Sequence, residues 1–199
     1  VGAMDGTYQV HVDNLATNSY LTVEANVSKT TDKITDSSGN FTYQYDKDGD
    51  GTMETYPVPG TPDTTLQGLA NLINNDKNNP GVTATIMEMG GKFYFQMYSN
   101  ESGAGTDIKI NQSDPFLQSM KAFRHPADPG NPSANPPIPA TPEGPNAWIP
   151  KAGTDAKFQI NGQDLTSSSN NFKVYGMEMN LTNAGDAIIT VGTDKKAMK

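Results

Sequence analysis

The residues with the clearest potential for chemistry are the acidic side chains of the stretch YDKDGDGTMETYP, which begins at position 45. Asp46, Asp48 and Asp50 alternate along it, and Gly51 follows them. Calcium loops of the EF-hand type place oxygen ligands at alternate positions, a glycine at the sixth position and a bidentate carboxylate at the twelfth. This spacing leaves two interpretations, a calcium loop or a tight turn between two strands.

The EF-hand interpretation fails at two points. Counted from Asp46, the ninth position is Glu54, but the twelfth is Pro57, which has no carboxylate. The flanking segments FTYQY and METYPV are typical of strands rather than helices. We therefore predict a hairpin loop, because Asp and Gly tolerate positive φ. A calcium site of another type, built from Asp46, Asp48 and Asp50, stays open, since a cation would relieve their like charges; calorimetry without heat on calcium addition would exclude it.

No group of residues has the spacing of a catalytic site. His11 alternates with the apolar side of a strand, which predicts that it points to solvent, and His125 borders a proline-rich segment. The chain has no GxSxG, P-loop or HExxH motif, and the serine run 167–169 has no base placed nearby by the sequence. We predict that the chain is not an enzyme, holds no cofactor and has no metal ligands other than the three candidate aspartates.

Composition narrows the function further. The 199 residues carry a net charge of −8, with 34% hydrophobic and 18% charged residues and no cysteine. A chain this acidic is not expected to bind nucleic acid through a basic patch, and no apolar run is long enough to span a bilayer. We therefore predict neither nucleic acid nor a membrane as a partner. No signal peptide is visible at the start, and we expect export without a cleaved one. The length fits one domain or two small ones with thin cores.

The hydrophobic pattern predicts strands and one clear helix. Apolar residues alternate over 7–12, 21–27 and 41–45, which is typical of half-buried strands. A helix is predicted near 64–75, where four apolar residues recur at helical spacing. These residues are Leu66, Leu69, Ala70 and Ile73. Two runs of alternating apolar residues joined by Gly90 and Gly91 then predict a β-hairpin. Residues 107–110 are predicted to form a further short strand.

The second half changes character twice. A short helix is predicted within 113–125, with Asp114 as its cap and Pro115 at its first position. Residues 126–150 contain nine prolines and predict an extended surface loop, with a packing role for Trp148 at its far end. Strands return from 152, with a last apolar strand at 187–191. The apolar positions change parity across Gly176, which predicts a β-bulge at that residue. With this many predicted strands, the predicted fold class is mainly β.

Two segments together resemble a known family. Residues 64–110 resemble the flagellin hook IN motif, here Ile73-Asn74, followed by a hairpin and a serine-glycine turn. Residues 155–195 resemble the C-terminal conserved part of hook-associated protein 2, the bacterial flagellar filament cap. The positions that carry this second resemblance are Ala156, Phe158, Ile160, Gly162, Ser167–Asn170 and Gly176. The stretch YQVHVDNLA matches the family's opening strand, whereas 126–150 departs from the family pattern.

The resemblance implies two small antiparallel β modules, one inserted into the other, without the family's coiled leg. It places an inner domain at 1–20 plus 116–199, with the proline-rich loop 126–150 inside it, and an inserted domain at 21–115. It also implies a structural role in an extracellular cap at the flagellum tip, which assists flagellin assembly through homo-oligomeric contacts. The implied partners are other copies of the chain, flagellin and, as further candidates, hook–filament junction proteins.

Two alternatives stay open beside the cap role. The first is adhesion to host mucin or cells by the exposed tip, for which the loop 126–150 is the segment to delete. If surface binding is lost and motility is kept, adhesion is favoured. The second alternative is a calcium-stabilised extracellular β module. The resemblance assigns no interaction residues and no copy number.

Overall fold

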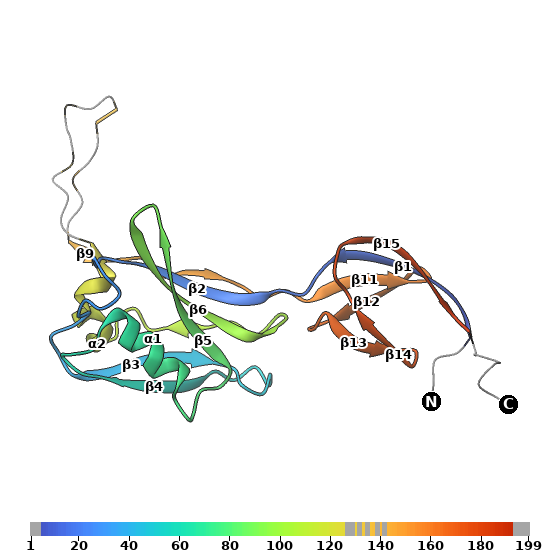
Figure 1. Cartoon of the computed structure of the whole chain (residues 1–199), viewed down its shortest axis with the longest axis horizontal. Coiled ribbons are helices and arrows are strands. Elements are labelled where there is room, and N and C mark those ends of the chain that lie inside the picture. Colours follow the sequence, from blue (N-terminus) through green and yellow to red (C-terminus); the bar gives the residue numbers. More distant parts are fainter. Residues whose placement is uncertain are drawn as a thin grey trace. The chain divides into compact units, whose positions relative to one another are not determined.

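The structure is a computed structural model that describes residues 5–125, 130, 133, 136, 137, 140 and 143–192. Its contacts divide the chain into two compact units, which we call unit 1 and unit 2. Unit 1 contains Val1–Ser19, Glu101–Thr106 and Ala152–Lys199, and unit 2 contains Tyr20–Asn100 and Asp107–Lys151. Figure 1 shows that both units consist largely of strands, which confirms the mainly β fold class.

Unit 1 is built on a four-stranded antiparallel sheet in the order β12-β11-β1-β15. Its strands are β1 (Gly6–Asn14), β11 (Ala156–Ile160), β12 (Gln163–Ser167) and β15 (Gly185–Val191). The register of β1 and β15 runs from Gly6 opposite Val191 to Val12 opposite Gly185. Strands from the two ends of the sequence therefore complete one sheet.

A hairpin of β13 (Asn171–Val174) and β14 (Met177–Asn180) belongs to the same core as this sheet. The predicted β-bulge at Gly176 is wrong. Val174 lies opposite Met177, and the two residues between them, Tyr175 and Gly176, have φ of 50° and 76°. Positive φ at both positions makes a two-residue turn that reverses the chain. Phe172 of β13 stacks on Phe158, with ring centroids 4.7 Å apart.

Unit 2 holds most of the remaining elements, arranged in three sheets and a few short helical segments. The sheet orders are β10-β2-β6-β5, β4-β3-β7 and β8-β9. The strands are β2 (Asn18–Ala25), β3 (Gly39–Tyr45), β4 (Glu54–Gly60), β5 (Val82–Met89), β6 (Lys92–Ser102), β7 (Lys109–Ile110), β8 (Arg124–His125), β9 (Gly144–Pro145) and β10 (Ile149–Lys151). The helical segments are α1 (Leu66–Asn74), α2 (Pro115–Ser119) and the 3-10 turn η1 (Lys121–Phe123). None of the helices in the described part of the chain could cross a membrane.

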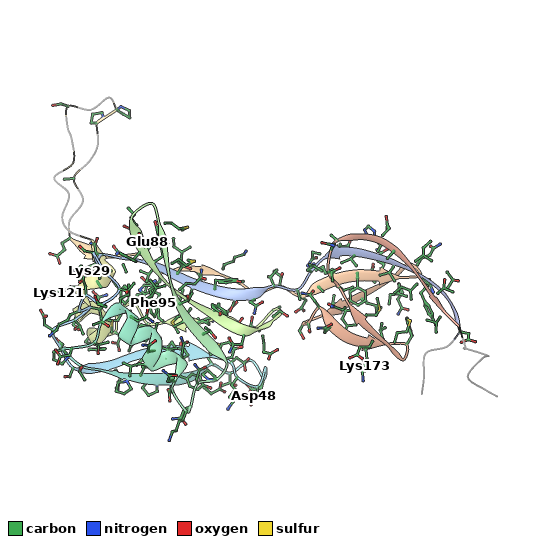
Figure 2. The ribbon with its side chains drawn as sticks, viewed as in Figure 1. Lys29, Asp48, Glu88, Phe95, Lys121 and Lys173 are labelled. Carbon is green, nitrogen blue, oxygen red and sulfur yellow. The ribbon has the colours of Figure 1, made fainter. Side chains whose placement is uncertain are left out.

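The predicted helix near 64–75 is confirmed as α1. The side chain of Thr65 caps it by accepting a hydrogen bond from the backbone N–H of Gly68 at 2.9 Å. Its four apolar residues are buried in the core of unit 2, together with Phe95 of β6, which Figure 2 labels. The hairpin at Gly90 and Gly91 is also confirmed, since Met89 lies opposite Lys92.

The second predicted helix is shorter than the segment 113–125. It ends at Ser119 as α2, and η1 follows directly. Asp114 caps it as predicted, because its carboxylate accepts hydrogen bonds from the N–H groups of Phe116 and Leu117. Pro115 occupies the first helical position.

The boundary between the units differs from the one inferred from the sequence. The sequence interpretation placed 116–199 in the inner domain, whereas the contacts place 107–151 in unit 2. The reason is hydrophobic burial, because Phe116 and Phe123 before the proline-rich segment and Trp148 at its far end lie in the core of unit 2. Twelve of the 25 residues of the predicted loop 126–150 lie outside the described residues, and the described end of the segment contains β9 and the start of β10 rather than loop alone.

Candidate functional site

The acidic stretch forms the loop of the β3–β4 hairpin in unit 2. Asp46, which is 9% exposed, accepts hydrogen bonds from the N–H groups of Gly49 and Gly51, both at 2.8 Å. Gly49 and Gly51 have φ of 73° and 89°, which disfavours other residues at these positions. The Thr52 N–H donates to Asp50 at 2.7 Å and lowers the pKa of that carboxyl. The loop is thus closed by its own carboxylates.

The loop also brings together the only candidate metal ligands found among the described residues. Carboxylate oxygens of Asp46, Asp48 and Asp50 lie within 4.8 Å of one another, and Asp48 and Asp50 are exposed. Such an all-oxygen set suits a hard cation. The flanking elements are strands, as predicted, and Glu54 instead accepts a hydrogen bond from the Lys47 N–H at 3.0 Å. The hydrogen bonds of Asp46 and Asp50 are sufficient to explain the turn without a bound cation. The absence of a functional metal stays a prediction.

Replacing Asp46 with alanine is expected to destabilise unit 2 by about 1–3 kcal/mol, because two backbone N–H groups lose their acceptor. The matched control is Asp48→Ala in the same loop, where an exposed carboxylate is removed. We expect a change of at most about 0.5 kcal/mol for the control. Urea unfolding followed by circular dichroism measures both, and equal effects would contradict the role of Asp46 as the residue that closes the loop.

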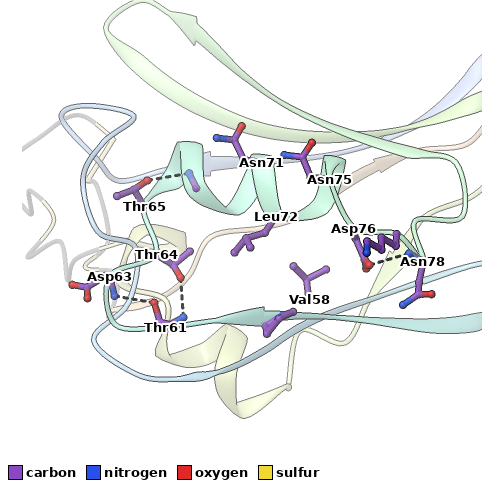
Figure 3. Close-up of a pocket in the computed structure, with 13 residues that line it drawn as sticks. Val58, Thr61, Asp63, Thr64, Thr65, Asn71, Leu72, Asn75, Asp76 and Asn78 are labelled. Atoms are coloured by element: carbon purple, nitrogen blue, oxygen red, sulfur yellow. Dashed lines mark hydrogen bonds between the residues drawn. The ribbon is translucent and has the colours of Figure 1, made fainter.

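A groove of about 610 Å³ lies between α1 and β4 and was not foreseen from the sequence (Figure 3). Val58 and Leu72 supply apolar surface, and Leu72 is 38% exposed although the other apolar residues of α1 are buried. Asp63 at the rim forms an ion pair with Lys33 at 2.5 Å. The lining contains no histidine, and its ionisable side chains are Asp63, Asp76 and Lys77. The other lining residues offer apolar contact and hydrogen bonds. In the sequence, Leu72 is an apolar residue outside the helical spacing of the four buried ones, and this signal could have indicated the groove.

Strand addition at the edge of β4 is disfavoured by two prolines. Strand β4 is an outer strand of its sheet, and its Pro57 and Pro59 lie opposite Thr42 and Asn40 of β3. Proline has no N–H, so in an intact ladder both positions face the free edge. At these two positions the edge lacks the donors that an added strand would need. A partner that docks on this side of unit 2 is therefore expected to use side chains rather than a continuous backbone ladder.

His11 of unit 1 is held by an acid from the neighbouring strand. Its Nδ1 lies 2.6 Å from the carboxylate of Asp186, directly opposite it in the β1–β15 register, and its Nε2 lies 3.5 Å from Asp13. The ring is exposed, as predicted, and no nucleophilic side chain hydrogen-bonds to it among the described residues. The hydrogen bond and charge of Asp186 raise the pKa of His11 above 6.5. The side chain of His125 lies outside what the structure describes.

The ion pair of His11 makes the stability of unit 1 depend on pH. Because the folded-state pKa is raised, the contribution is fully present below the unfolded pKa of 6.5 and is lost as pH rises through the folded value. His11→Gln should therefore lower the melting temperature of unit 1 at about pH 5.5 and leave it unchanged at about pH 9. Asp186→Asn serves as the matched variant, because it should remove the same pH-dependent contribution to the stability of unit 1. A gap between His11→Gln and the parent protein that stays constant with pH would contradict this assignment.

Comparisons with known proteins give a consistent picture. The chain is 29% identical over 121 residues to the lateral flagellar hook-associated protein 2 of Vibrio parahaemolyticus, covering 55% of this chain and 25% of that protein. It is 30% identical over 112 residues to the B-type flagellar hook-associated protein 2 of Pseudomonas aeruginosa, covering 56% and 22%. The chain thus spans about a quarter of the length of these curated relatives. No family model matches it.

The fold is also found among solved structures. The crystal structure of the D2-D3 domains of the flagellar cap protein FliD from Escherichia coli superposes with a TM-score of 0.71 and 23% identity. The match covers 96% of this chain and 91% of that chain, so nearly the entire chain has the fold of that two-domain fragment. Together with the curated relatives, this confirms the resemblance to the head of hook-associated protein 2 that the sequence motifs indicated.

Proposed function

We propose that this chain is the head region of a flagellar filament cap protein and that its two units are building surfaces of the cap. The observation that carries the proposal is the match of nearly the entire chain to one two-domain cap fragment. The sequence similarity to two hook-associated proteins 2 supports the same assignment independently of the fold. The expected location is the extracellular tip of the flagellum.

The finer part of the proposal is that the head assists flagellin assembly through contacts between copies of the chain. In a ring with rotational symmetry each copy presents one patch to a different patch of its neighbour. Contacts that must shift as each flagellin subunit inserts should be modest in area and partly polar. A chain with 34% hydrophobic residues and half-exposed sheet faces suits such contacts.

The structure also suits a role without chemistry. The groove beside α1 has no histidine in its lining, the acidic loop is closed by its own hydrogen bonds, and His11 is engaged by Asp186. We therefore propose a structural component rather than an enzyme. The interpretation as a mucin adhesin gains no specific support from the described residues. The calcium-stabilised module is supported by the three clustered aspartates alone, and the cap role is the one we carry forward.

A labelling experiment in cells tests the location. The chain has no cysteine, and Glu88 near the tip of the β5–β6 hairpin is exposed (Figure 2), so Glu88→Cys in the full-length protein introduces a thiol for a maleimide dye. We expect a single fluorescent focus at the distal end of each filament. Lys173→Cys on the exposed side of unit 1 should give the same focus, and the parent protein gives the background. Label along the filament, or only at its base, would overturn the proposal.

A further inference from the structure

One face of the sheet β10-β2-β6-β5 is not covered by the core of unit 2. Along β2 and β6 the buried residues alternate with half-exposed ones, so one side of the sheet packs on α1 and the other side is open. We call the open side the tyrosine face. It is defined by Tyr20, Thr22, Met87, Tyr94, Gln96 and Tyr98.

The residues of the tyrosine face contact one another across the strands. The rings of Tyr20 and Tyr98 lie with their centroids 5.9 Å apart, and the Lys151 ammonium lies 6.0 Å from the centroid of Tyr20. Gln96 donates a hydrogen bond to the hydroxyl of Thr22 at 3.0 Å, and Met87 lies opposite Tyr94. These contacts hold large side chains in place before any partner arrives, which reduces the entropy lost on docking.

The composition of this face is that of a contact surface. Tyrosine and methionine are enriched in protein interfaces, and tyrosine is frequent among the residues that carry most of the binding energy. Within the described part of the chain, no group hydrogen-bonds to the hydroxyls of Tyr20, Tyr94 or Tyr98, so they are available to a partner. Next to the face, Ile149 of β10 is 66% exposed and extends its apolar area.

The charge of the tyrosine face favours an acidic partner. The charged residues on this side of the sheet are Glu24, Lys92 and Lys151, which give it a net charge of +1. Since the whole chain carries −8, the rest of it carries −9. Any other surface of a second copy is therefore, on average, complementary to this face, whereas two such faces would oppose their own lysines. The charge pattern favours a head-to-tail contact, the kind that closes a ring.

We infer that the tyrosine face is the surface through which one copy of this chain docks on the acidic surface of the next copy. The inference rests on the proposed cap function and adds to it the surface and the partner. It differs from docking in the groove beside α1, for which no occupant is indicated by charge or composition. Flagellin and glycans are the competing occupants that the tests must separate.

The first test is photo-crosslinking in cells. The full-length protein carries p-benzoylphenylalanine in place of Tyr94, which keeps an aromatic ring at the position. Irradiation is expected to give a covalent dimer of the chain that mass spectrometry identifies, and the linked residues of the second copy should lie outside its own tyrosine face. Crosslinks to flagellin or to glycan, or none at all in cells whose Glu88 label is at the filament tip, would overturn the inference.

The second test reverses the charge of the face. Met87→Glu with Lys151→Glu changes its net charge from +1 to −2. Sedimentation velocity of the full-length protein should show self-association weakened about tenfold or more. The matched control is Thr42→Glu with Lys109→Glu, which makes the same total change on β3 and β7, and it should associate like the parent protein.

The two tests separate this inference from the proposed function. Circular dichroism and melting temperature show whether each variant is folded before association is measured. If the Glu88 label lies at the filament tip while the charge-reversed face associates normally, the inference is wrong and the cap function stands. If the label is absent from the tip, the cap function itself is wrong.

Discussion

Replacing Trp148 with alanine should destabilise unit 2 by about 3–5 kcal/mol, because the substitution leaves a large cavity in its core. Trp148 is 5% exposed and is the single tryptophan of the chain. Its ring centroid lies 5.2 Å from that of Phe123, 5.9 Å from Phe41 and 6.2 Å from Phe95. The four rings come from separate parts of the sequence, so their packing joins these segments in one core.

The measurement must not depend on tryptophan fluorescence, since the variant has no tryptophan. Urea unfolding followed by circular dichroism gives the free energy directly. Ile149→Ala at the adjacent position is the control, because that side chain is 66% exposed and should change the stability by at most about 0.5 kcal/mol. A loss below about 1 kcal/mol for Trp148→Ala would show that the aromatic cluster does not hold the core together.

The largest expected effect in unit 1 comes from Gly153. A Cβ atom at this position would lie 2.3 Å from the carbonyl oxygen of Gly103, 2.6 Å from the Thr106 hydroxyl and 3.0 Å from the carbonyl oxygen of Thr17. Two of these atoms are backbone, and the Thr17 carbonyl also accepts the Gly103 N–H at 3.0 Å. The methyl group of an alanine could fit only if this backbone moved.

Gly153→Ala is therefore expected to cost about 1–3 kcal/mol, the range for overpacked sites. Gly192→Ala is the matched control, because a Cβ there meets no atom within 4 Å and the residue needs no positive φ. The melting transition of unit 1 should fall for Gly153→Ala and stay in place for Gly192→Ala. Equal transitions for the two variants would mean that the chain relaxes around Gly153 at little cost.

The Trp148 site bears on the proposed function because it lies in the core behind the proposed contact surface. The cluster around Trp148 fixes the core onto which the inner side of β2 and β6 packs, and the tyrosine face is the other side of the same strands. Loss of that core would therefore disturb the proposed contact without touching any residue of the face. Variants of Trp148 should accordingly not be used to test the contact between copies.

Features that depend on neighbouring residues could be predicted from the sequence. The helix α1 follows from four apolar residues at helical spacing and a threonine cap, and both signals lie within a few residues. The turns at Gly90-Gly91 and Asn161-Gly162 follow from residues that adopt positive φ. The rejection of an EF-hand also used local information, the missing carboxylate at Pro57.

Local information was insufficient at Gly176 and at the boundary of the units. A bulge and a two-residue turn change the parity of the apolar positions in the same way, and only the pairing of Val174 with Met177 distinguishes them. The apolar residues on either side of the proline-rich segment could have packed on either module. Their burial with Phe95 in unit 2 is a long-range contact that the pattern around them does not encode.

The amino-acid sequence by itself thus determined the strands, the helix, most of the turns and the resemblance to the filament cap. The tertiary structure decided which strands share a sheet, which core contains Trp148 and which sheet face stays open with its tyrosines. The physical reason is that turn geometry, caps and periodicity act over a few residues. Sheet order and burial, in contrast, depend on contacts between segments far apart in the chain.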